Sequence, residues 1–393
     1  MPPAHPIAAV THPNPYPYYE RLVAERPLYY DTELACWVVS SAAVVTAILT
    51  DPNCRVRPVA EPVPPSLSGS PAGELFRRLV RMTDGREHER LRPAIATALD
   101  TVTKPDSETT IQRWATTLLA GRDDDPSPGK FANYAMGLPV YVVGSLLGIA
   151  DAHLGQIVPW VDDFTRCLTP KSTPEQVERG KDAAVQLTSL IRATCHDRES
   201  ELPNGPLHSL AHALTSIEDN TEEAVIANGV GLLAQTYEAT GGLIGNTLLA
   251  LASRPELLQQ VASDLERTRQ LVHEVLRFDS PIQNTRRFVA TDGAIAGQPV
   301  TAGEMVLIVL AAANRDPLAN PNPERFAVQR SHRRLFTFGA GPHACPGAAL
   351  ASTIATIGVN QIIASGLDIG PLAGAVVYRP SANARVPILG FTK

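Results

Sequence analysis

The sequence predicts a mainly α-helical protein with a small β-rich part. Apolar residues recur at helical spacing through most of the segment from about Ile111 to Leu214, and again in Glu256–Phe278. One long helix should begin after Asn220 and extend to about Ala252. β-prone runs are short, and they occur mainly in Pro27–Ser41 and in the segment that ends at Ile308. Helices therefore dominate, and any sheet should be small.

The size of the chain allows either one large domain or two ordinary ones. It has 393 residues, of which 44% are apolar, so it can build a substantial core. No shift in composition marks a boundary between two domains, and no internal repeat is found. The net charge of −6 gives no reason to expect a nucleic acid partner.

The cysteines and the N-terminus bear on where the protein works. The five cysteines are odd in number, widely scattered and without a CxxC pair, which favours a reducing compartment and argues against a zinc site. The N-terminus lacks a basic segment followed by an apolar core, so we expect no signal peptide. No run approaches the ~20 consecutive apolar residues needed to cross a bilayer. We therefore expect a cytoplasmic protein with no membrane partner.

The N-terminal part should contain a hairpin, a short helix, a loop and a basic helical stretch. Two β-prone runs separated by polar residues make up Pro27–Ser41. Pro58–Gly73 is too rich in Pro, Ser and Gly for regular structure, and we expect a surface or pocket-covering loop there. Most arginines of Glu74–Leu99 should form a solvated helix face. His88 and Arg92 are four residues apart, so they share one face of a helix.

The long helix carries polar residues in its apolar middle. Asn220 followed by Glu223 forms an N-cap pattern with its return partner. At ~1.5 Å per residue the helix spans roughly 45 to 50 Å, enough to cross a whole domain, so it should be central. Buried polar groups in such a helix need partners or a purpose. Glu238 is therefore either a surface glutamate on an exposed stripe or a functional acid.

A further helix, Glu256–Phe278, contains Glu274 and Arg277 three residues apart. Alone, such a pair is an ordinary surface ion pair worth ~0 to 1 kcal/mol. Its place in the chain gives it more meaning, because Arg325 lies downstream in the segment PERF and a cysteine loop comes after that segment.

The cysteine loop, Leu335–Leu350, places Cys345 in a glycine-rich turn that opens onto a helix. Glycines can adopt positive φ or approach a flat ligand closely. Pro346 suits a first helical turn, so residues from Ala348 onward should be helical. A cysteine among the unpaired N–H groups of a helix start should favour the thiolate. The alternative is a buried structural cysteine at a turn.

The longer string Phe338-Gly339-x-Gly341-x-His343-x-Cys345-x-Gly347 resembles the haem loop of the cytochrome P-450 superfamily. HxxxR, the acidic long helix, ExxR, PERF and the cysteine loop also occur in that family's order. The resemblance implies a single cytochrome P-450 domain over residues 1–393, mainly α with a small β-rich part. It implies haem b (iron protoporphyrin IX) held between the long central helix and the Cys345 loop, and the soluble bacterial type of enzyme.

The resemblance also implies roles for individual residues. Cys345 would ligate the iron, and thiolate ligation favours O–O cleavage. Arg suits propionate binding because its planar fork pairs with carboxylates, and Arg286 is an alternative to Arg287. The residues that would seat the haem are His88, Arg92, Arg287, Phe338, Gly339, His343, Cys345 and Gly347. Glu274, Arg277 and Arg325 would form a buried supporting network. The substrate pocket would include Ile282, Gln283, Asn284, Thr285, Ala382 and Asn383.

The middle of the long helix departs from the family. The family pattern is a small residue, Gly, any residue, an acid and Thr, and here these positions read Gln235, Thr236, Tyr237, Glu238 and Ala239. The acid is present and the alcohol is absent. Thr240 lies about 100° further round the helix. We hypothesise that the Gln235 amide, an ordered water or a substrate hydroxyl completes the proton relay.

The function implied by the resemblance is that of a haem-thiolate monooxygenase of bacterial secondary metabolism. Dioxygen and two electrons from a ferredoxin-type donor with its reductase would oxidise a small organic molecule. Because Ala239 replaces the usual alcohol, oxidative coupling or peroxide-driven oxidation is an alternative. A haem-binding sensor without turnover is a further alternative. Least favoured is a cysteine hydrolase using Cys345 and His343, which lie too close in one loop to serve as nucleophile and base.

Overall fold

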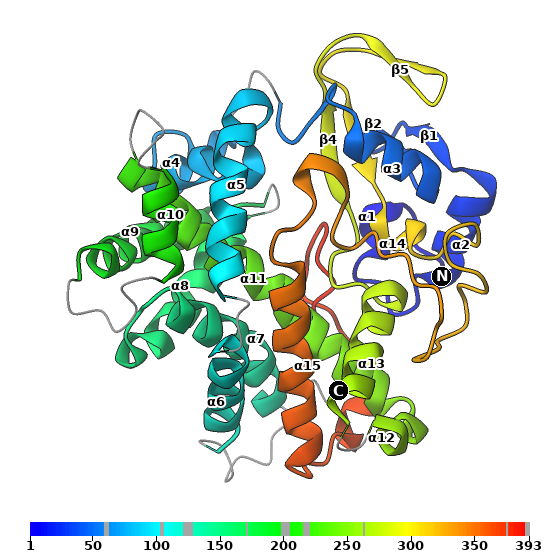
Figure 1. Cartoon of the computed structure of the whole chain (residues 1–393). Helices are drawn as coiled ribbons and strands as arrows, with labels where there is room; N and C mark the ends of the chain where they lie inside the picture. Colours follow the sequence, from blue (N-terminus) through cyan, green and yellow to red (C-terminus); the bar gives the residue numbers. More distant parts are fainter. Residues whose placement is uncertain are drawn as a thin grey trace.

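The computed structural model of the protein describes residues 1–58, 63–102, 106–120, 129–169, 172–197, 205–214, 221–261, 264–374 and 376–389. Figure 1 shows a large helical part beside a smaller part that contains the strands and the N-terminus. The helices are α1 (Pro6–Ala9), α2 (Tyr16–Glu25), α3 (Ala42–Thr50), α4 (Pro71–Arg78), α5 (Gly85–Val102), α6 (Asp106–Ala120), α7 (Gly129–Leu146), α8 (Asp151–Cys167), α9 (Pro174–His196), α10 (Pro206–Leu214), α11 (Thr221–Ala252), α12 (Pro255–Val261), α13 (Leu265–Phe278), α14 (Leu310–Ala313) and α15 (Ala348–Ala364). Short 3-10 helices are η1 (Pro65–Leu67), η2 (Val80–Met82), η3 (Gly341–His343) and η4 (Gly370–Ala373).

The predicted central helix is α11, which has 32 residues. It packs against α4, α7, α8, α9, α10, α12, α13 and α15. Close packing depends on small residues: a Cβ on Gly241 would lie 2.7 Å from Met136 Sδ of α7. The prediction of a long helix that crosses the domain is therefore confirmed, while the predicted N-cap, Asn220, lies outside the described residues.

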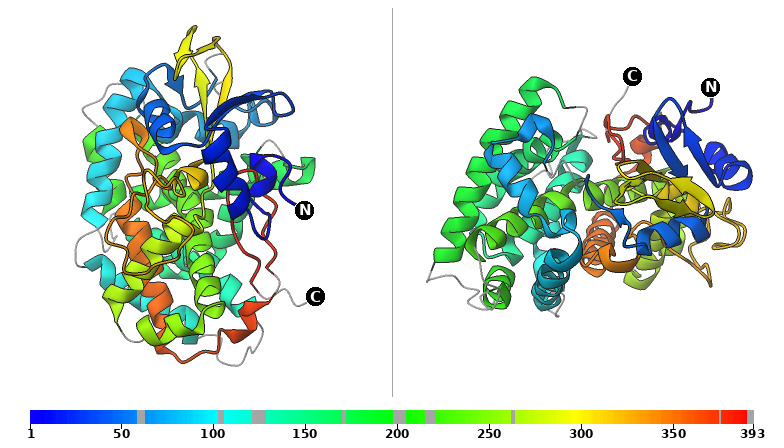
Figure 2. Two further views of the ribbon diagram at one scale, coloured as in Figure 1. Left: turned by 90° about the vertical axis from the view of Figure 1, so that its right-hand side faces the viewer. Right: turned by 90° about the horizontal axis from the view of Figure 1, so that it is seen from above.

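The sheet is small, as predicted. Its strands are β1 (Leu28–Asp31), β2 (Cys36–Val39), β3 (Cys54–Arg55), β4 (Thr285–Val289), β5 (Gly293–Ile295), β6 (Gln298–Val300) and β7 (Met305–Ile308). Five of them form one sheet in the order β1-β2-β7-β4-β3, in which only β2 and β7 run parallel. The predicted hairpin in Pro27–Ser41 is the β1–β2 pair. The separate hairpin β5–β6 projects from the strand-containing part (Figure 2).

The region between the sheet and α5 differs from the prediction. The basic stretch Glu74–Leu99 is two helices, because the backbone becomes extended at Leu79, where α4 ends, and α5 begins only at Gly85, after η2. The loop predicted over Pro58–Gly73 is shorter than expected, since η1 and the start of α4 lie within it. Its residues 59–62 lie outside the described part.

The helical stretch Gly341–Ala364 is long and apolar enough to cross a membrane by length and composition, with a mean hydropathy of 1.4. Half of that stretch is buried inside the protein. Its main helix, α15, packs against α6, α7, α11 and α13. The core helix of a soluble protein can be equally long and apolar, so this feature alone does not indicate a membrane span.

Candidate functional site

The cysteine loop folds back on itself before α15 begins. Gly339 and Gly341 adopt positive φ, 68° and 69°, as predicted for this turn. A Cβ on Gly341 would lie 2.8 Å from the carbonyl oxygen of Leu49 in α3, so only glycine fits there. The backbone N–H of Cys345 donates to the carbonyl of Phe338 over 2.8 Å. Helix α15 begins at Ala348, as predicted.

Cys345 differs from the other cysteines in its accessibility. Its side chain is exposed, whereas Cys36, Cys54 and Cys167 are buried and Cys195 is half-buried. The alternative of a buried structural cysteine is therefore wrong. The protein alone does not favour the expected thiolate, because desolvation raises the pKa of Cys345. The hydrogen bond from the Gly347 N–H and the charge of Arg92 lower this pKa, but they offset the desolvation only in part. A coordinated metal ion reverses this balance, since it deprotonates a thiol outright.

Two imidazoles and a guanidinium lie next to the loop. The rings of His88 and His343 have centroids 4.1 Å apart. Nε2 of His343 lies 3.2 Å from Oδ1 of Asp84. Arg92 Nη2 donates to the carbonyl of Ala344, the residue before Cys345, over 3.0 Å. The predicted HxxxR pair on α5 is thus brought to the cysteine loop.

These basic groups are poorly neutralised. Burial, helped by the charges of His343 and Arg92, lowers the pKa of His88 to about 4. Arg287 on β4 is only 5% exposed, and its Nη1 donates to the carbonyl of the neighbouring Arg286 over 2.8 Å. Burial lowers the Arg287 pKa too, although Asp84 partly opposes this. In the part of the chain that the structure describes, Asp84 is the carboxylate that acts on both groups. Arg92 and Arg287 therefore supply positive charge for an anionic ligand, and His88 lies beside them as a neutral imidazole near pH 7.

One face of α11 stays accessible although the helix is central. Leu232, Gln235, Thr236 and Ala239 keep accessible surface, and their spacing puts them on one helical stripe. A stripe of this kind in the middle of a packed helix borders a space inside the protein. Gln235 Nε2 donates to the carbonyl of Gly231 over 2.8 Å, so part of the amide suggested for the relay is already used.

Thr240 lies away from that stripe. It is 1% exposed, and its hydroxyl has no hydrogen-bond partner among the described residues. The accessible position is Ala239, which has no hydroxyl. The structure therefore does not bring the Thr240 hydroxyl to the accessible face of α11.

Glu238 is half-buried within a group of charges from three segments. Asp162 on α8 pairs with Arg166 at 2.8 Å and with Arg379, near the C-terminus, at 3.0 Å. Desolvation raises the pKa of Glu238; the Arg379 charge opposes this and the Asp162 charge adds to it. The Glu238 carboxyl is therefore predisposed to hold a proton, which a surface glutamate is not.

Glu274 and Arg277 form a buried network, with both side chains 0% exposed. Arg277 donates to Glu274 over 2.7 Å and to the carbonyl of Pro323 over 2.8 Å. The expectation that the Arg325 side chain joins this network is wrong, because that side chain is exposed and only its carbonyl accepts, from Arg277, over 3.0 Å.

The arginines that reach Glu274 are Arg333, at 3.0 Å, and Arg330, at 3.4 Å. Asn322, with a φ of 49°, turns the backbone just before PERF, which directs carbonyl groups rather than the Arg325 side chain inward. Sequence reasoning missed Arg330 and Arg333. The signal that could have found them is the basic run RSHRR, which follows PERF within a few residues and offers further arginines as partners for Glu274.

The two predicted pocket segments lie side by side. Ile282 forms an isolated bridge with Ala384, and the Gln283 N–H donates to the carbonyl of Asn383 over 2.8 Å. The Gln283 side chain is already engaged, however, because it is 2% exposed, its amide oxygen accepts from Tyr19 over 2.6 Å and its amide nitrogen donates to the Ser280 carbonyl. Gln283 is thus a buried residue that connects neighbouring segments by hydrogen bonds, and it is not available to a ligand.

The remaining pocket candidates differ in accessibility. Asn284 is 2% exposed and donates to the carbonyl of Ala382, itself 7% exposed, over 2.8 Å. Ile282 and Thr285 are partly accessible, and Asn383 is exposed. Of these six residues, Ile282, Thr285 and Asn383 therefore keep surface that a ligand could contact.

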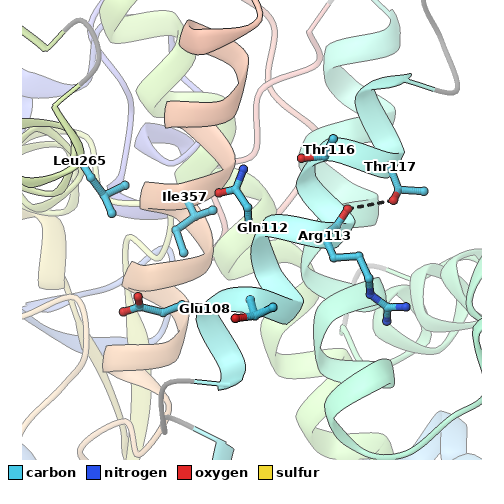
Figure 3. A pocket seen from close by; sticks show the side chains of 8 residues that line it. Glu108, Gln112, Arg113, Thr116, Thr117, Leu265 and Ile357 are labelled. Carbon is cyan, nitrogen blue, oxygen red and sulfur yellow. Dashed lines mark hydrogen bonds between the residues drawn. The ribbon is translucent and has the colours of Figure 1, made fainter.

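An open depression lies elsewhere, between α6, α15 and the start of α13 (Figure 3). It is lined by Glu108, Thr109, Gln112, Arg113, Thr116, Thr117, Leu265 and Ile357. Gln112 on α6 also donates to the side-chain oxygen of Gln361 on α15, over 2.5 Å. None of the predicted site residues lines this depression, so it is separate from the candidate site.

Comparisons with known proteins agree with the site and the fold. A family model described as cytochrome P450 matches residues 158–365, just over half of the chain. The biotin biosynthesis cytochrome P450 of Bacillus subtilis is 27% identical over 89% of this chain and 88% of its own length. The vitamin D(3) 25-hydroxylase of Pseudonocardia autotrophica is 29% identical over 95% of this chain and 92% of its own.

The fold is shared with solved structures over nearly its whole length. P450BioI, solved in complex with a hexadecenoic acid-ligated acyl carrier protein, has a TM-score of 0.82 and 26% identity, and covers 95% of this chain and 97% of its own. CalO2 has a TM-score of 0.84 and 23% identity, with 96% of both chains covered. The chain therefore belongs to the cytochrome P450 family and is a monooxygenase of that family.

Proposed function

We propose that this enzyme binds haem b and oxidises a small organic molecule with dioxygen and two electrons from a ferredoxin-type donor with its reductase. The observation that carries the proposal is the exposed Cys345 next to the poorly neutralised cluster of His88, Arg92 and Arg287. A single soft sulfur donor and buried cations fit a flat dianionic ligand with a central iron. When bound, haem supplies an iron that activates dioxygen.

The residues of this chain would each take a separate task. Cys345 would ligate the iron, while Arg92, Arg287, His88 and His343 would bind the propionates. Arg92 also ties α5 to the loop through Ala344, so the propionate site and the sulfur are held together. Glu274 and Arg277 would support the loop through the segment after PERF. The Glu238 carboxyl, with its raised pKa, passes protons toward the accessible face of α11.

The proposal also covers the domain organisation of the chain, its cellular location and the type of metabolism in which it works. We place all 393 residues in one domain, because the largest hydrophobic cluster runs from Leu67 to Leu389 and Ile282 packs against both this cluster and the one that contains strands of the sheet. The five cysteines, all free, support a reducing, cytoplasmic location. Bacterial relatives, among them the monooxygenase PikC of Streptomyces venezuelae, support an enzyme of bacterial secondary metabolism.

The test is the absorption spectrum of the reduced, carbon monoxide-bound protein. We expect the strongly red-shifted Soret band of thiolate ligation, and we expect Cys345→Ser to abolish it. Cys195→Ser is the matched control, because Cys195 is a half-buried cysteine on α9 outside the proposed site, and it should leave the band unchanged. A thiolate band that survives in Cys345→Ser would refute the assignment of the iron ligand.

A second reaction is favoured by one observation: the accessible face of α11 presents Ala239, and the Thr240 hydroxyl is buried away from it. Without the usual alcohol, the oxidation can end in coupling or another outcome that inserts no oxygen. Reaction under ¹⁸O-labelled dioxygen separates the two candidates. Label in the product supports oxygen insertion, and an oxidised product without label supports coupling.

A further inference from the structure

Arg81 is an arginine that has no counterion among the residues that the structure describes. It lies in η2, where Leu79, Val80 and Thr83 are buried but the Arg81 side chain is accessible. Among the described residues, Arg81 has no hydrogen-bond or ion-pair partner, and burial alone lowers its pKa, with no acid acting against this. Arg81 is therefore an accessible cation in a turn whose backbone is bonded to Asn228 of α11.

The turn that carries Arg81 is fixed against α11. Asn228 Oδ1 accepts from the backbone N–H of Val80 over 3.0 Å, and Asn228 Nδ2 donates to the carbonyl of Arg78 over 3.2 Å. The Thr83 hydroxyl closes the turn by donating to the Val80 carbonyl over 2.8 Å. The backbone on both sides of Arg81 is therefore held in place, and its side chain has a defined starting point.

This turn lies beside the accessible stripe of α11. A Cβ on Gly231 would lie 2.6 Å from Leu79 Cδ2 and 3.2 Å from Gln235 Nε2, so the Leu79 side chain and the Gln235 amide both lie next to Gly231. Gln235 is exposed and uses Nε2 to bond the Gly231 carbonyl, which holds its side chain along the helix. Arg81 and Gln235 are thus polar groups at the same end of the stripe that leads to Ala239.

Arg81 remains as an additional cation after the two haem propionates have been paired with other basic residues. Under the proposed function, the two propionate charges are met by Arg92 and Arg287, with His88 and His343 as further partners. A desolvated guanidinium without an anion is costly, and its planar fork pairs best with a carboxylate. We propose that Arg81 binds the carboxylate of the substrate and that Gln235 makes a second polar contact, so that the enzyme oxidises organic acids. This inference rests on the proposed function.

The experiment is a spectral titration of the haem-loaded enzyme. Decanoic, 4-phenylbutyric and indole-3-acetic acids are each compared with their own primary amide, at neutral pH and low salt, where the acids are ionised. At least one acid should bind about 10- to 100-fold more tightly than its amide, as expected for a charge-assisted pair. Arg81→Gln should abolish this preference, and Arg81→Lys, which keeps the charge, should retain part of it. Arg86→Gln is the matched control, because Arg86 is an exposed arginine nearby on α5, and it should keep the full preference.

Three results would overturn the inference. One is a wild-type enzyme that binds no acid of the set more tightly than its amide. Another is an Arg81→Gln variant that keeps the preference. The third is an Arg81→Gln variant that loses haem to an apoprotein acceptor faster than the wild-type enzyme does, which would make Arg81 a propionate ligand. Failure of the proposed function is distinguishable, because it removes the thiolate band itself, whereas these results leave that band intact.

Discussion

Replacing Glu274 with Gln tests the buried network most directly. The substitution keeps the size of the side chain and removes its charge, so it leaves Arg277, Arg330 and Arg333 around a neutral amide. The exposed fractions of these three side chains are 0%, 8% and 12%. Removing one partner from a buried ion pair costs about 3 to 5 kcal/mol, because the remaining charges stay desolvated. We expect Glu274→Gln to lose that much free energy of unfolding, or roughly 4 to 6 °C in Tm for 393 residues.

The same substitution should change the pH dependence of stability. Desolvation raises the Glu274 pKa, but the hydrogen bonds and charge of Arg277, with those of Ala327 and Arg333, outweigh it and lower the pKa overall. A carboxyl whose folded pKa is lowered stabilises the fold above its unfolded pKa, near 4.3, and this contribution is lost as the pH falls through the folded value. Wild-type stability should therefore fall below about pH 4 by a step that Glu274→Gln lacks.

The assay is urea denaturation followed by far-ultraviolet circular dichroism, from pH 3 to 8. The matched control is Glu266→Gln on the same helix, where Glu266 pairs with Arg269 and the two side chains are 53% and 57% exposed. Such a surface pair contributes about 0 to 1 kcal/mol. A loss in Glu274→Gln no larger than in this control would refute the view that the network holds the segment after PERF in place.

Four further substitutions test other parts of the structure. Arg325→Ala should change the free energy of unfolding by less than about 0.5 kcal/mol, because its side chain is exposed, whereas Arg333→Ala should cost about 1 to 3 kcal/mol; equal losses in urea denaturation would contradict this order. Gly241→Ala should cost about 1 to 3 kcal/mol, because its Cβ would lie 2.7 Å from Met136 Sδ, and a Tm at the wild-type value would argue against such close packing of α11 on α7. Ala239→Thr should not greatly raise the product formed per electron consumed if other groups complete the relay; a large gain with the same product would mean that the native site is merely impaired.

Much of this protein could be predicted from the sequence, because the signals are local. The helical period and the length of the run after Asn220 predicted α11, and the two β-prone runs of Pro27–Ser41 predicted the β1–β2 hairpin. The glycines of the cysteine loop predicted its positive φ values at Gly339 and Gly341. The ordered motifs predicted the family, and the family model and the solved structures agree with it.

The pairing of side chains across the chain could not be predicted in this way, because it depends on how distant segments pack. The motifs indicated that an arginine should join Glu274, but Arg325 and Arg333 are equally basic, and only in the fold is Arg333 seen to reach Glu274 while the Arg325 side chain is exposed. In the same way, Gln283 is not available to a ligand because the hydroxyl of Tyr19, 264 residues away, donates to its amide oxygen. The accessible stripe of α11, and Arg81 beside it without a partner in the described part of the chain, depend on how several helices pack around one. A motif records residue types and spacing, whereas burial and partnership depend on the path of distant backbone, which no local pattern contains.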